Sequence, residues 1–358
     1  MRHSLLQCLT LQCSAFSVVA VVASAALAGD PATCAAIADD HVRLACYDAA
    51  FTVERPGTTH RDATTDLRAP PAADAQPQDS TGQPAADERS LIGERWSRYE
   101  PAAGYPFLVR LHDANYVMLR HSNRVNVAPV SPAHPDADIS RDIERDELKF
   151  QVSFKSRLWE SSDRRYATWL GYTQQSNWQA LNAPQSRPFR ESDYQPELMF
   201  VMQPDRALIG GLRWQLLNVG LVHQSNGLSD PGSRSWNRIY AQFGVEDDHF
   251  AGGKLAILAR PWVRLHERST RDDNPDITDY LGYGDLRLLW RRGEQTLTFT
   301  GRGNPRTRKG AAQIEWSAPA IGAFRYYVQV FTGYGESLID YNFRQTVFGA
   351  GFSLNDLF

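Results

Sequence analysis

Leu217-Leu-Asn-Val-Gly-Leu-Val-His-Gln-Ser-Asn-Gly-Leu-Ser-Asp-Pro-Gly-Ser-Arg-Ser-Trp-Asn-Arg-Ile-Tyr240 is the stretch that points most directly to a fold, because it predicts two strands joined by a turn-rich loop. Successive side chains of a strand point to opposite faces. In the first strand Leu221 therefore shares a face with His223 and Ser225. We expect a largely apolar face whose last positions are polar.

A hairpin made of these two strands would bring three polar side chains together. If it closes symmetrically around residues 226–234, His223 lies opposite Asn237 and Ser225 lies opposite Ser235. A serine hydroxyl is a weak nucleophile until a base accepts its proton, and the base needs a third group that fixes its tautomer. A pair of polar residues at a sheet edge is the commoner meaning of His-x-Ser. Here the polar groups continue the apolar face, which favours a catalytic trio.

The segment from 91 to 358 predicts further strands separated by turn signals, with hardly any helical periodicity beyond one short helix within 90–99. An even number of strands suits a closed antiparallel barrel of the bacterial outer membrane, so we expect an all-β, twelve-stranded transmembrane barrel, with ten or fourteen strands as the alternatives. The strands are expected near residues 105–120, 145–160, 164–176, 192–205, 209–225, 234–246, 249–266, 276–292, 294–304, 308–318, 321–335 and 342–358.

Composition is compatible with such a barrel. The formal net charge is −3 and the isoelectric point is near 6.3, so no basic surface indicates nucleic-acid binding. The mean hydropathy of −0.44 looks like that of a soluble protein, but alternating strands never produce a long apolar run. A soluble β-sandwich or a lipocalin-like barrel is the alternative. The terminal aromatic Phe358 and the signs of export favour the membrane barrel.

The N-terminal part predicts export. An apolar run that ends in Ala26-Leu-Ala28 indicates a signal peptide over residues 1–28. Residues 29–54 form a small periplasmic segment, expected to be helical, in which Cys34 and Cys46 favour a disulfide, with two buried free thiols as the alternative. Residues 55–90 are rich in Pro, Ala, Asp and Gln and predict a disordered linker.

Several separate blocks of the segment from Arg95 to Phe358 resemble the outer membrane phospholipase A family. They are His223–Pro231, Ser233–Arg238, Pro188–Glu191, Asp272–Thr278, Gly333–Phe343 and the terminal Leu354–Phe358. The resemblance implies a twelve-stranded outer-membrane barrel whose catalytic residues are Ser225 as nucleophile, His223 as base and Asn237 as the group that holds the imidazole. Backbone N–H groups of the loop that begins Asn226-Gly227 lie beside the nucleophile in the sequence, and Gly227 is the candidate oxyanion donor.

The resemblance also implies calcium. The ligands would be the carbonyl of Leu228, Ser233 and, across a dimer, Ser186, while Asp230 and Asp273 match a related monomer site. Hard oxygen ligands suit Ca²⁺. Leu228 replaces the basic residue of the family pattern, but a backbone oxygen does not depend on the side chain. Without the resemblance, these are ordinary loop residues.

The function implied is that of a calcium-dependent phospholipase A1/A2 of the outer membrane. It would hydrolyse phospholipids and lysophospholipids on a site toward the outer leaflet, and it would be active as a homodimer. Gln174, on an otherwise apolar face, is the expected dimer contact, with a polar residue in the headgroup zone as the alternative. The other functions left open are a lipid A deacylase and a non-catalytic barrel or porin.

Overall fold

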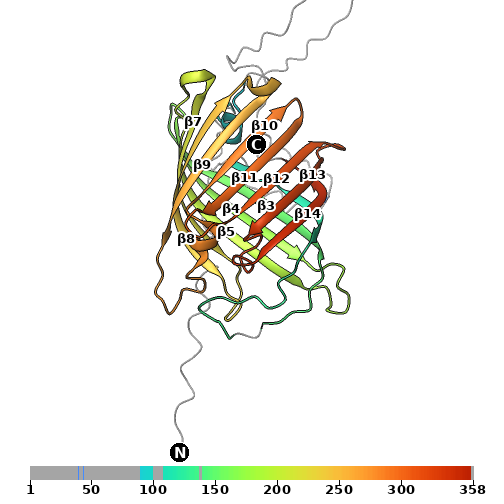
Figure 1. Ribbon diagram of the computed structural model, residues 1–358. Helices are drawn as coiled ribbons and strands as arrows, with labels where there is room; N and C mark the ends of the chain where they lie inside the picture. Colours follow the sequence, from blue (N-terminus) through green and yellow to red (C-terminus); the bar gives the residue numbers. More distant parts are fainter. Residues whose placement is uncertain (1–38, 40–42, 44–88, 100–107, 137–138, 356–358) are drawn as a thin grey trace, which may run out of the picture. The chain divides into compact units, whose positions relative to one another are not determined.

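The computed structural model describes residues 39, 43, 89–99, 108–136 and 139–355 (Figure 1). The predicted signal peptide, Cys34, Cys46, the predicted linker up to residue 88 and Phe358 therefore lie outside the described residues.

Twelve long strands of the described chain form one closed antiparallel sheet, as predicted. Each strand pairs with its neighbours in sequence, and β2 pairs with both β3 and β14, which closes the ring. The strands are β2 (Tyr116–Ser122), β3 (Asp146–Glu160), β4 (Tyr166–Trp178), β5 (Phe189–Met202), β7 (Arg213–Ser225), β8 (Ser235–Asp247), β9 (Lys254–Leu265), β10 (Gly284–Arg292), β11 (Gln295–Asn304), β12 (Lys309–Pro319), β13 (Arg325–Tyr334) and β14 (Arg344–Ser353).

Three predicted strands differ from the observed elements. The strand expected over 105–120 is interrupted, because β1 (Leu108–Leu111) and β2 pair with separate parts of β3. The strand expected over 276–292 begins with helix α4 (Ile277–Leu281), which ends at Gly282 with a positive φ of 73°. The strand expected from 209 begins with the 3₁₀ turn η2 (Ile209–Gly211), next to the short strand β6 (Arg206–Ala207), which pairs with β7.

The barrel wall is apolar outside and polar inside. Large apolar side chains are exposed along the strands, among them Leu119, Val152, Phe154, Leu170, Leu198, Phe200, Val219, Leu221, Ile239, Phe243, Val263, Phe299, Ile314, Val330 and Phe348. The buried side chains that alternate with them include Arg120, Glu147, Lys149, Lys155, Arg190, Glu197, Asn218, Arg238, Gln242, Glu315 and Gln329. This pattern is the inverse of a soluble barrel and matches strands surrounded by lipid.

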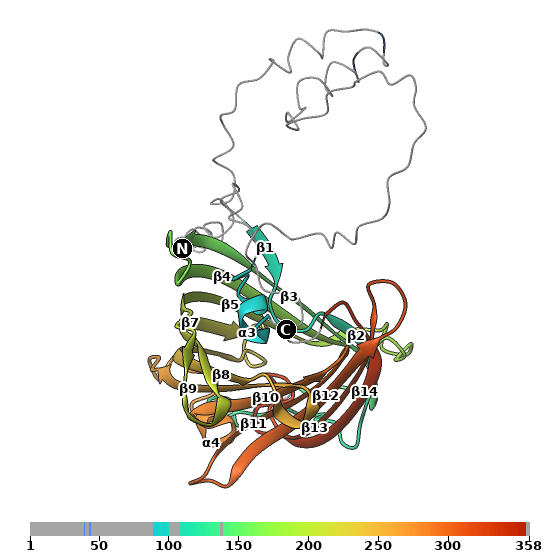
Figure 2. The ribbon, with the colours of Figure 1, turned by 90° about the horizontal axis from the view of Figure 1, so that it is seen from above.

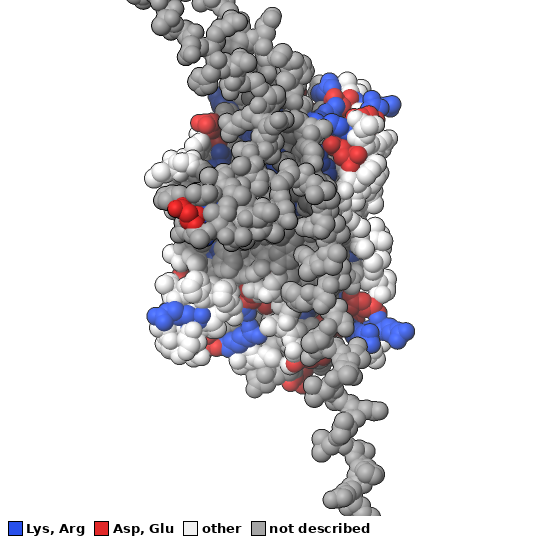
Figure 3. Space-filling model, turned by 180° about the vertical axis from the view of Figure 1, so that it is seen from behind, with Lys and Arg blue, Asp and Glu red and all other residues white. Residues whose placement is uncertain are grey.

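On the outer surface, charged side chains lie toward the two ends of the barrel. At the right edge of Figure 3, blue and red atoms lie at the top and at the bottom, and uncharged atoms lie between them. Among the described residues, no helix is long and apolar enough to cross a bilayer.

A short helix fills one part of the lumen. Helix α3 (Leu91–Arg95) begins at Ser90, whose Oγ accepts a hydrogen bond from Gly93 N at 2.9 Å, and it lies inside the ring of strands in Figure 2. Ile92 is fully buried, and its N–H donates to the Glu246 carboxylate of β8. The helix predicted within 90–99 is therefore confirmed, and it packs an apolar cluster against an otherwise polar interior.

The connections differ at the two ends of the barrel. The segments after β2, β4, β7, β9 and β13 are the longer loops and share one end, here called the loop end, at the bottom of Figure 1. The connections 161–165, 248–253, 293–294 and 320–324 lie at the other end, here called the turn end. Long loops on one side and short turns on the other are typical of outer-membrane barrels, whose long loops are extracellular.

Burial of Ile92 predicts a stabilising role for α3. The substitution Ile92→Ala should lower the free energy of unfolding by about 2–5 kcal/mol, because it leaves a cavity between the helix and the wall. Ile209→Ala is the matched control, since Ile209 is 91% exposed and the change should cost less than about 0.5 kcal/mol. Unfolding of both variants in detergent micelles tests this. Equal losses in the two variants would show that α3 does not stabilise the barrel.

Candidate active site

The β7–β8 hairpin has the register that its sequence predicts. His223 pairs with Asn237 and Ser225 pairs with Ser235. On the same face, Val219 and Leu221 are exposed, whereas the alternate residues of β7 are buried or partly buried toward the lumen. His223 is exposed, and Ser225 and Asn237 are half-buried. The three polar groups therefore lie on the outer wall, at the loop end of the apolar band.

The imidazole and the carboxamide are in direct contact. His223 Nδ1 lies 2.8 Å from Asn237 Oδ1. Ser225 is two residues further along β7 on the same face, about 7 Å from His223 between Cα atoms in a regular strand. The other nitrogen of the ring, Nε2, is the one left available for the hydroxyl. The structure thus places the three residues that the sequence singled out on one face of two paired strands.

A further contact to Asn237 was not predicted. Its Nδ2 donates a hydrogen bond to Glu267 Oε1 at 2.9 Å. Glu267 follows the last residue of β9 by two positions and therefore continues the face of Leu265, which pairs with Asn237. The only indication in the sequence was the alternation of side chains, which puts Glu267, just beyond the predicted strand, on the same face as Leu265.

The loop after Ser225 is held by the buried side chain of Asn226. Its Oδ1 accepts from Arg234 N at 2.9 Å, and its Nδ2 donates to the Gly232 carbonyl at 2.9 Å. The next residue, Gly227, has a positive φ of 65°, and a Cβ there would lie 3.1 Å from the ring of Tyr194. Both observations favour glycine at this position. The loop thus presents its backbone directly beside the serine.

Three loops bring candidate metal-ligating side chains together at the loop end. Ligand atoms of Asp230, Asp273 and His134 lie within 4.8 Å of one another. Ser233 Oγ donates to Asp273 Oδ2 at 2.6 Å. Asp230, Ser233 and Asp273 were predicted as calcium ligands. His134 was not, because it belongs to the loop between β2 and β3 and nothing in its local sequence marks it.

The two other predicted metal ligands are Leu228 and Ser186, which belong to different loops. Leu228 has an exposed side chain in the β7–β8 loop. Ser186 is exposed on the loop between β4 and β5, with a positive φ of 61°. Ser186 was predicted to bind calcium across the interface of a dimer.

The loop between β9 and β10 is fastened to the hairpin. Asn274 Oδ1 accepts from Ser235 N at 3.0 Å, and Arg264 pairs with Asp272 at 2.6 Å. Tyr341, from the loop between β13 and β14, donates to Asp276 Oδ1 at 2.6 Å. Burial and this carboxylate raise the pKa of Tyr341 well above its usual range, so the phenol remains a donor. These contacts fix the loop that carries Glu267 and Asp273.

The predicted dimer residue lies in register with the serine, across β5. Gln174 of β4 pairs with Tyr194 of β5, which in turn pairs with Ser225 of β7. Gln174 Oε1 accepts from Tyr172 Oη at 3.1 Å, and its Nε2 donates to Ser176 Oγ at 3.2 Å. An amide can make more bonds than these two, so it retains capacity for a partner.

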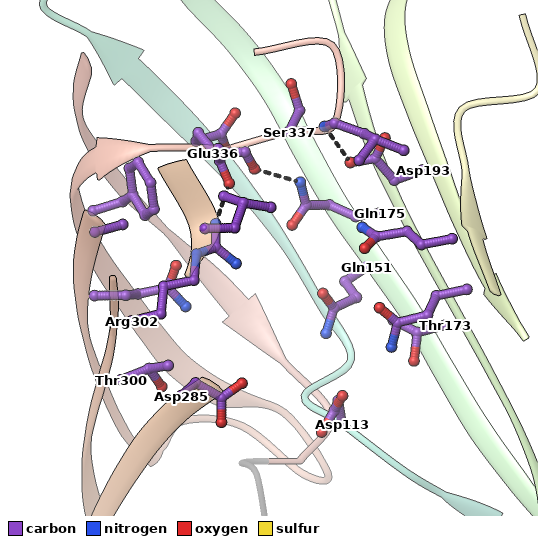
Figure 4. A pocket seen from close by; sticks show the side chains of 18 of the residues that line it. Asp113, Gln151, Thr173, Gln175, Asp193, Asp285, Thr300, Arg302, Glu336 and Ser337 are labelled. Atoms are coloured by element: carbon purple, nitrogen blue, oxygen red, sulfur yellow. Dashed lines mark hydrogen bonds between the residues drawn. The ribbon is translucent and has the colours of Figure 1, made fainter. Parts of the chain in front are cut away.

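A cavity also lies in the lumen, away from the outer site. It has a volume of about 210 Å³ and is lined by polar side chains, including Asp113, Gln151, Asp285 and Arg302 (Figure 4). Gln175 reaches across it to the Glu336 carbonyl at 3.1 Å. Such a lining does not suit an acyl chain, whereas the outer wall is apolar.

Comparison with known proteins identifies the family. The family model for phospholipase A1 matches residues 92–354. A phospholipase A1 homologue of Neisseria meningitidis serogroup B is 38% identical over 100% of this chain and 96% of its own length. The phospholipase A1 of Escherichia coli K12 is 38% identical over 71% of this chain and 83% of its own length.

Solved structures agree. The outer membrane phospholipase A of Escherichia coli superposes with a TM-score of 0.66 at 35% identity, over 75% of this chain and 100% of that one. The Salmonella typhi outer membrane phospholipase, solved as a dimer with bound calcium, gives a TM-score of 0.65 at 36% identity, over 75% and 98% of the two chains. This chain is therefore a member of the phospholipase A1 family, an enzyme of the outer membrane built on a closed twelve-stranded barrel.

Proposed function

We propose that Ser225, His223 and Asn237 hydrolyse the acyl ester bonds of glycerophospholipids and lysophospholipids, as a phospholipase A1/A2, on the part of the wall that faces the outer leaflet. The observation that carries the proposal is the position of the trio. The imidazole and amide are bonded at 2.8 Å on the face that also exposes Val219 and Leu221. A lipid that diffuses in the bilayer reaches this face without leaving its apolar surroundings.

The reaction follows from the groups present. Ser225 Oγ attacks the ester carbonyl carbon while His223 Nε2 accepts the hydroxyl proton. The bond to the glycerol oxygen then breaks, and His223 returns the proton to that oxygen. Water attacks the acyl-serine, His223 accepts its proton, and the fatty acid leaves as Ser225 Oγ recovers a proton. Asn237 Oδ1 holds Nδ1–H throughout.

The negative charge on the carbonyl oxygen needs a donor. Within the described chain the Gly227 N–H has no hydrogen-bond partner, and it lies two residues after the nucleophile in a loop fixed by Asn226. A preorganised backbone donor of this kind stabilises the transition state more than the substrate.

The loop end has a donor set that fits calcium. Carboxylates of Asp230 and Asp273 and the hydroxyl of Ser233 are hard oxygen ligands of the kind that Ca²⁺ takes. His134, as a nitrogen donor in the same cluster, is the one member that calcium prefers less. The Leu228 carbonyl, Ser233 and a Ser186 from a second chain form the other proposed set, which requires the dimer. When bound, the ion supplies positive charge beside the developing oxyanion.

An amide in place of a carboxylate at position 237 suits the outer wall. A charged group that faces hydrocarbon is costly unless it is paired. Asn237 orients the ring without a charge inside the apolar band. The Salmonella relative was solved as a dimer, and Gln174 lies in register with Ser225, across β5, so we infer that a second copy of this chain docks beside the site.

Ser225→Ala should reduce fatty acid release from phosphatidylcholine in mixed micelles roughly a thousandfold or more, since the nucleophile is lost. Ser235→Ala is the matched control, because Ser235 is the directly opposite serine on β8, and it should retain activity within a few fold. Full activity of Ser225→Ala would exclude Ser225 as the nucleophile.

Removal of calcium with EDTA should abolish hydrolysis, and Ca²⁺ should restore it. Asp230→Asn and Asp273→Asn should each raise the calcium concentration for half-maximal activity roughly tenfold or more, because each removes a charged ligand. Asp279→Asn is the control, since Asp279 is a half-buried carboxylate on α4 that pairs with Arg306. Hydrolysis that persists in EDTA would contradict the calcium proposal.

Gln174→Leu should weaken dimerisation in micelles roughly eightfold. Two symmetric hydrogen bonds across the interface, at about 0.6 kcal/mol each, would be lost. Crosslinking and activity should fall together as protein concentration is lowered. Gln295→Leu, at an exposed glutamine of β11, should leave the dimer unchanged. An unchanged dimer in Gln174→Leu would place the contact elsewhere.

A further inference from the structure

We propose that Glu267 is a positioning residue of the active site, whose carboxylate holds the Asn237 amide in the one orientation that makes His223 a base. The inference rests on the proposed roles of His223 and Asn237. It adds a fourth side chain, from the segment just after a third strand, to the trio.

The geometry follows from the pairing of β8 with β9. Asn237 pairs with Leu265, and Val263, two residues earlier on the same face, is 68% exposed on the outer wall. Glu267, two residues after Leu265, is in phase with this outward face. Its Oε1 lies 2.9 Å from Asn237 Nδ2, while Asn237 Oδ1 lies 2.8 Å from His223 Nδ1. The three side chains thus form one continuous chain of hydrogen bonds.

The donors and acceptors in this series of hydrogen bonds can be arranged in only one direction. An ionised carboxylate only accepts hydrogen bonds, so the amide must turn its NH₂ toward Glu267 and its oxygen toward His223. The oxygen in turn only accepts, so the proton of the neutral ring must lie on Nδ1. The lone pair is then on Nε2, the nitrogen that takes the serine proton.

Without the carboxylate the amide has two orientations. Turned by 180°, it would offer its NH₂ to Nδ1 and stabilise the tautomer that is protonated on Nε2. That tautomer cannot accept a proton from Ser225. A neutral orienting group therefore needs a partner that distinguishes its two ends, and Glu267 is such a partner.

The position of the carboxylate also fits the lipid environment. Glu267 lies past the end of β9, at the loop end, and is half-buried. Water can reach it there, so its charge does not have to be moved into hydrocarbon. The metal-binding cluster contains Asp230 and Asp273 but not Glu267, which separates its role from that of a calcium ligand.

The test begins with two substitutions assayed on phosphatidylcholine micelles at saturating calcium. Glu267→Ala should lower kcat about tenfold with little change in KM, because it removes the partner that selects the amide orientation. Glu267→Gln should lower kcat by less than Glu267→Ala does, because its amide can accept from Asn237 but can also turn and donate, and so selects the orientation less strongly than a carboxylate. Arg268→Ala, at the exposed neighbour, should behave as the wild type.

A double-mutant cycle and a spectroscopic measurement distinguish positioning from a general structural effect. In an Asn237→Ala background, Glu267→Ala should cause no further loss. The ¹⁵N shifts of His223 should report the Nδ1–H tautomer in the wild type and a mixture in Glu267→Ala. Wild-type kcat in Glu267→Ala, or an equal loss in both backgrounds, would overturn the inference. Activity that survives Ser225→Ala would instead overturn the proposed function.

Discussion

The structure depends on one constraint, which is that every backbone N–H and C=O in the apolar band must be paired within the protein. The pairing of β2 with β14 satisfies it by closing the ring. In the closed barrel, polar side chains fill the lumen. There Arg120 and Arg190 pair with the fully buried Glu147. Because the inside is filled in this way, lipid can meet the enzyme only on the outer wall. The location of the site is thus a consequence of closure.

Alternation and local turns made the strands predictable. The β7–β8 register followed from the sequence because both strands and their loop are contiguous, and a slip of one residue would exchange the two faces. The start of the strand expected at 276 was wrong because long-range contacts override the local pattern. Tyr341 binds Asp276 just before α4, and Asn304 donates to the Thr278 carbonyl within it. Neither partner is near in sequence.

The same distinction explains what could be predicted of the site. Ser225, His223 and Asn237 belong to one hairpin, so spacing alone placed them on one face. His134 comes from another loop, and only the fold brings it beside Asp230 and Asp273. Glu267 was partly predictable. It is in phase with β9, but its relation to Asn237 requires the pairing of β8 with β9, which the sequence does not give directly.

The apolar band on the wall has a further consequence, because it sets the depth at which the enzyme sits. A bilayer whose thickness does not match this band has to thin or thicken around it, at a cost of fractions of a kcal/mol per Å, so part of the mismatch remains. Ser225 lies at the last outward position of β7, so its height relative to the ester plane changes with acyl-chain length. The turnover rate would then depend on the thickness of the membrane, with no change in the protein.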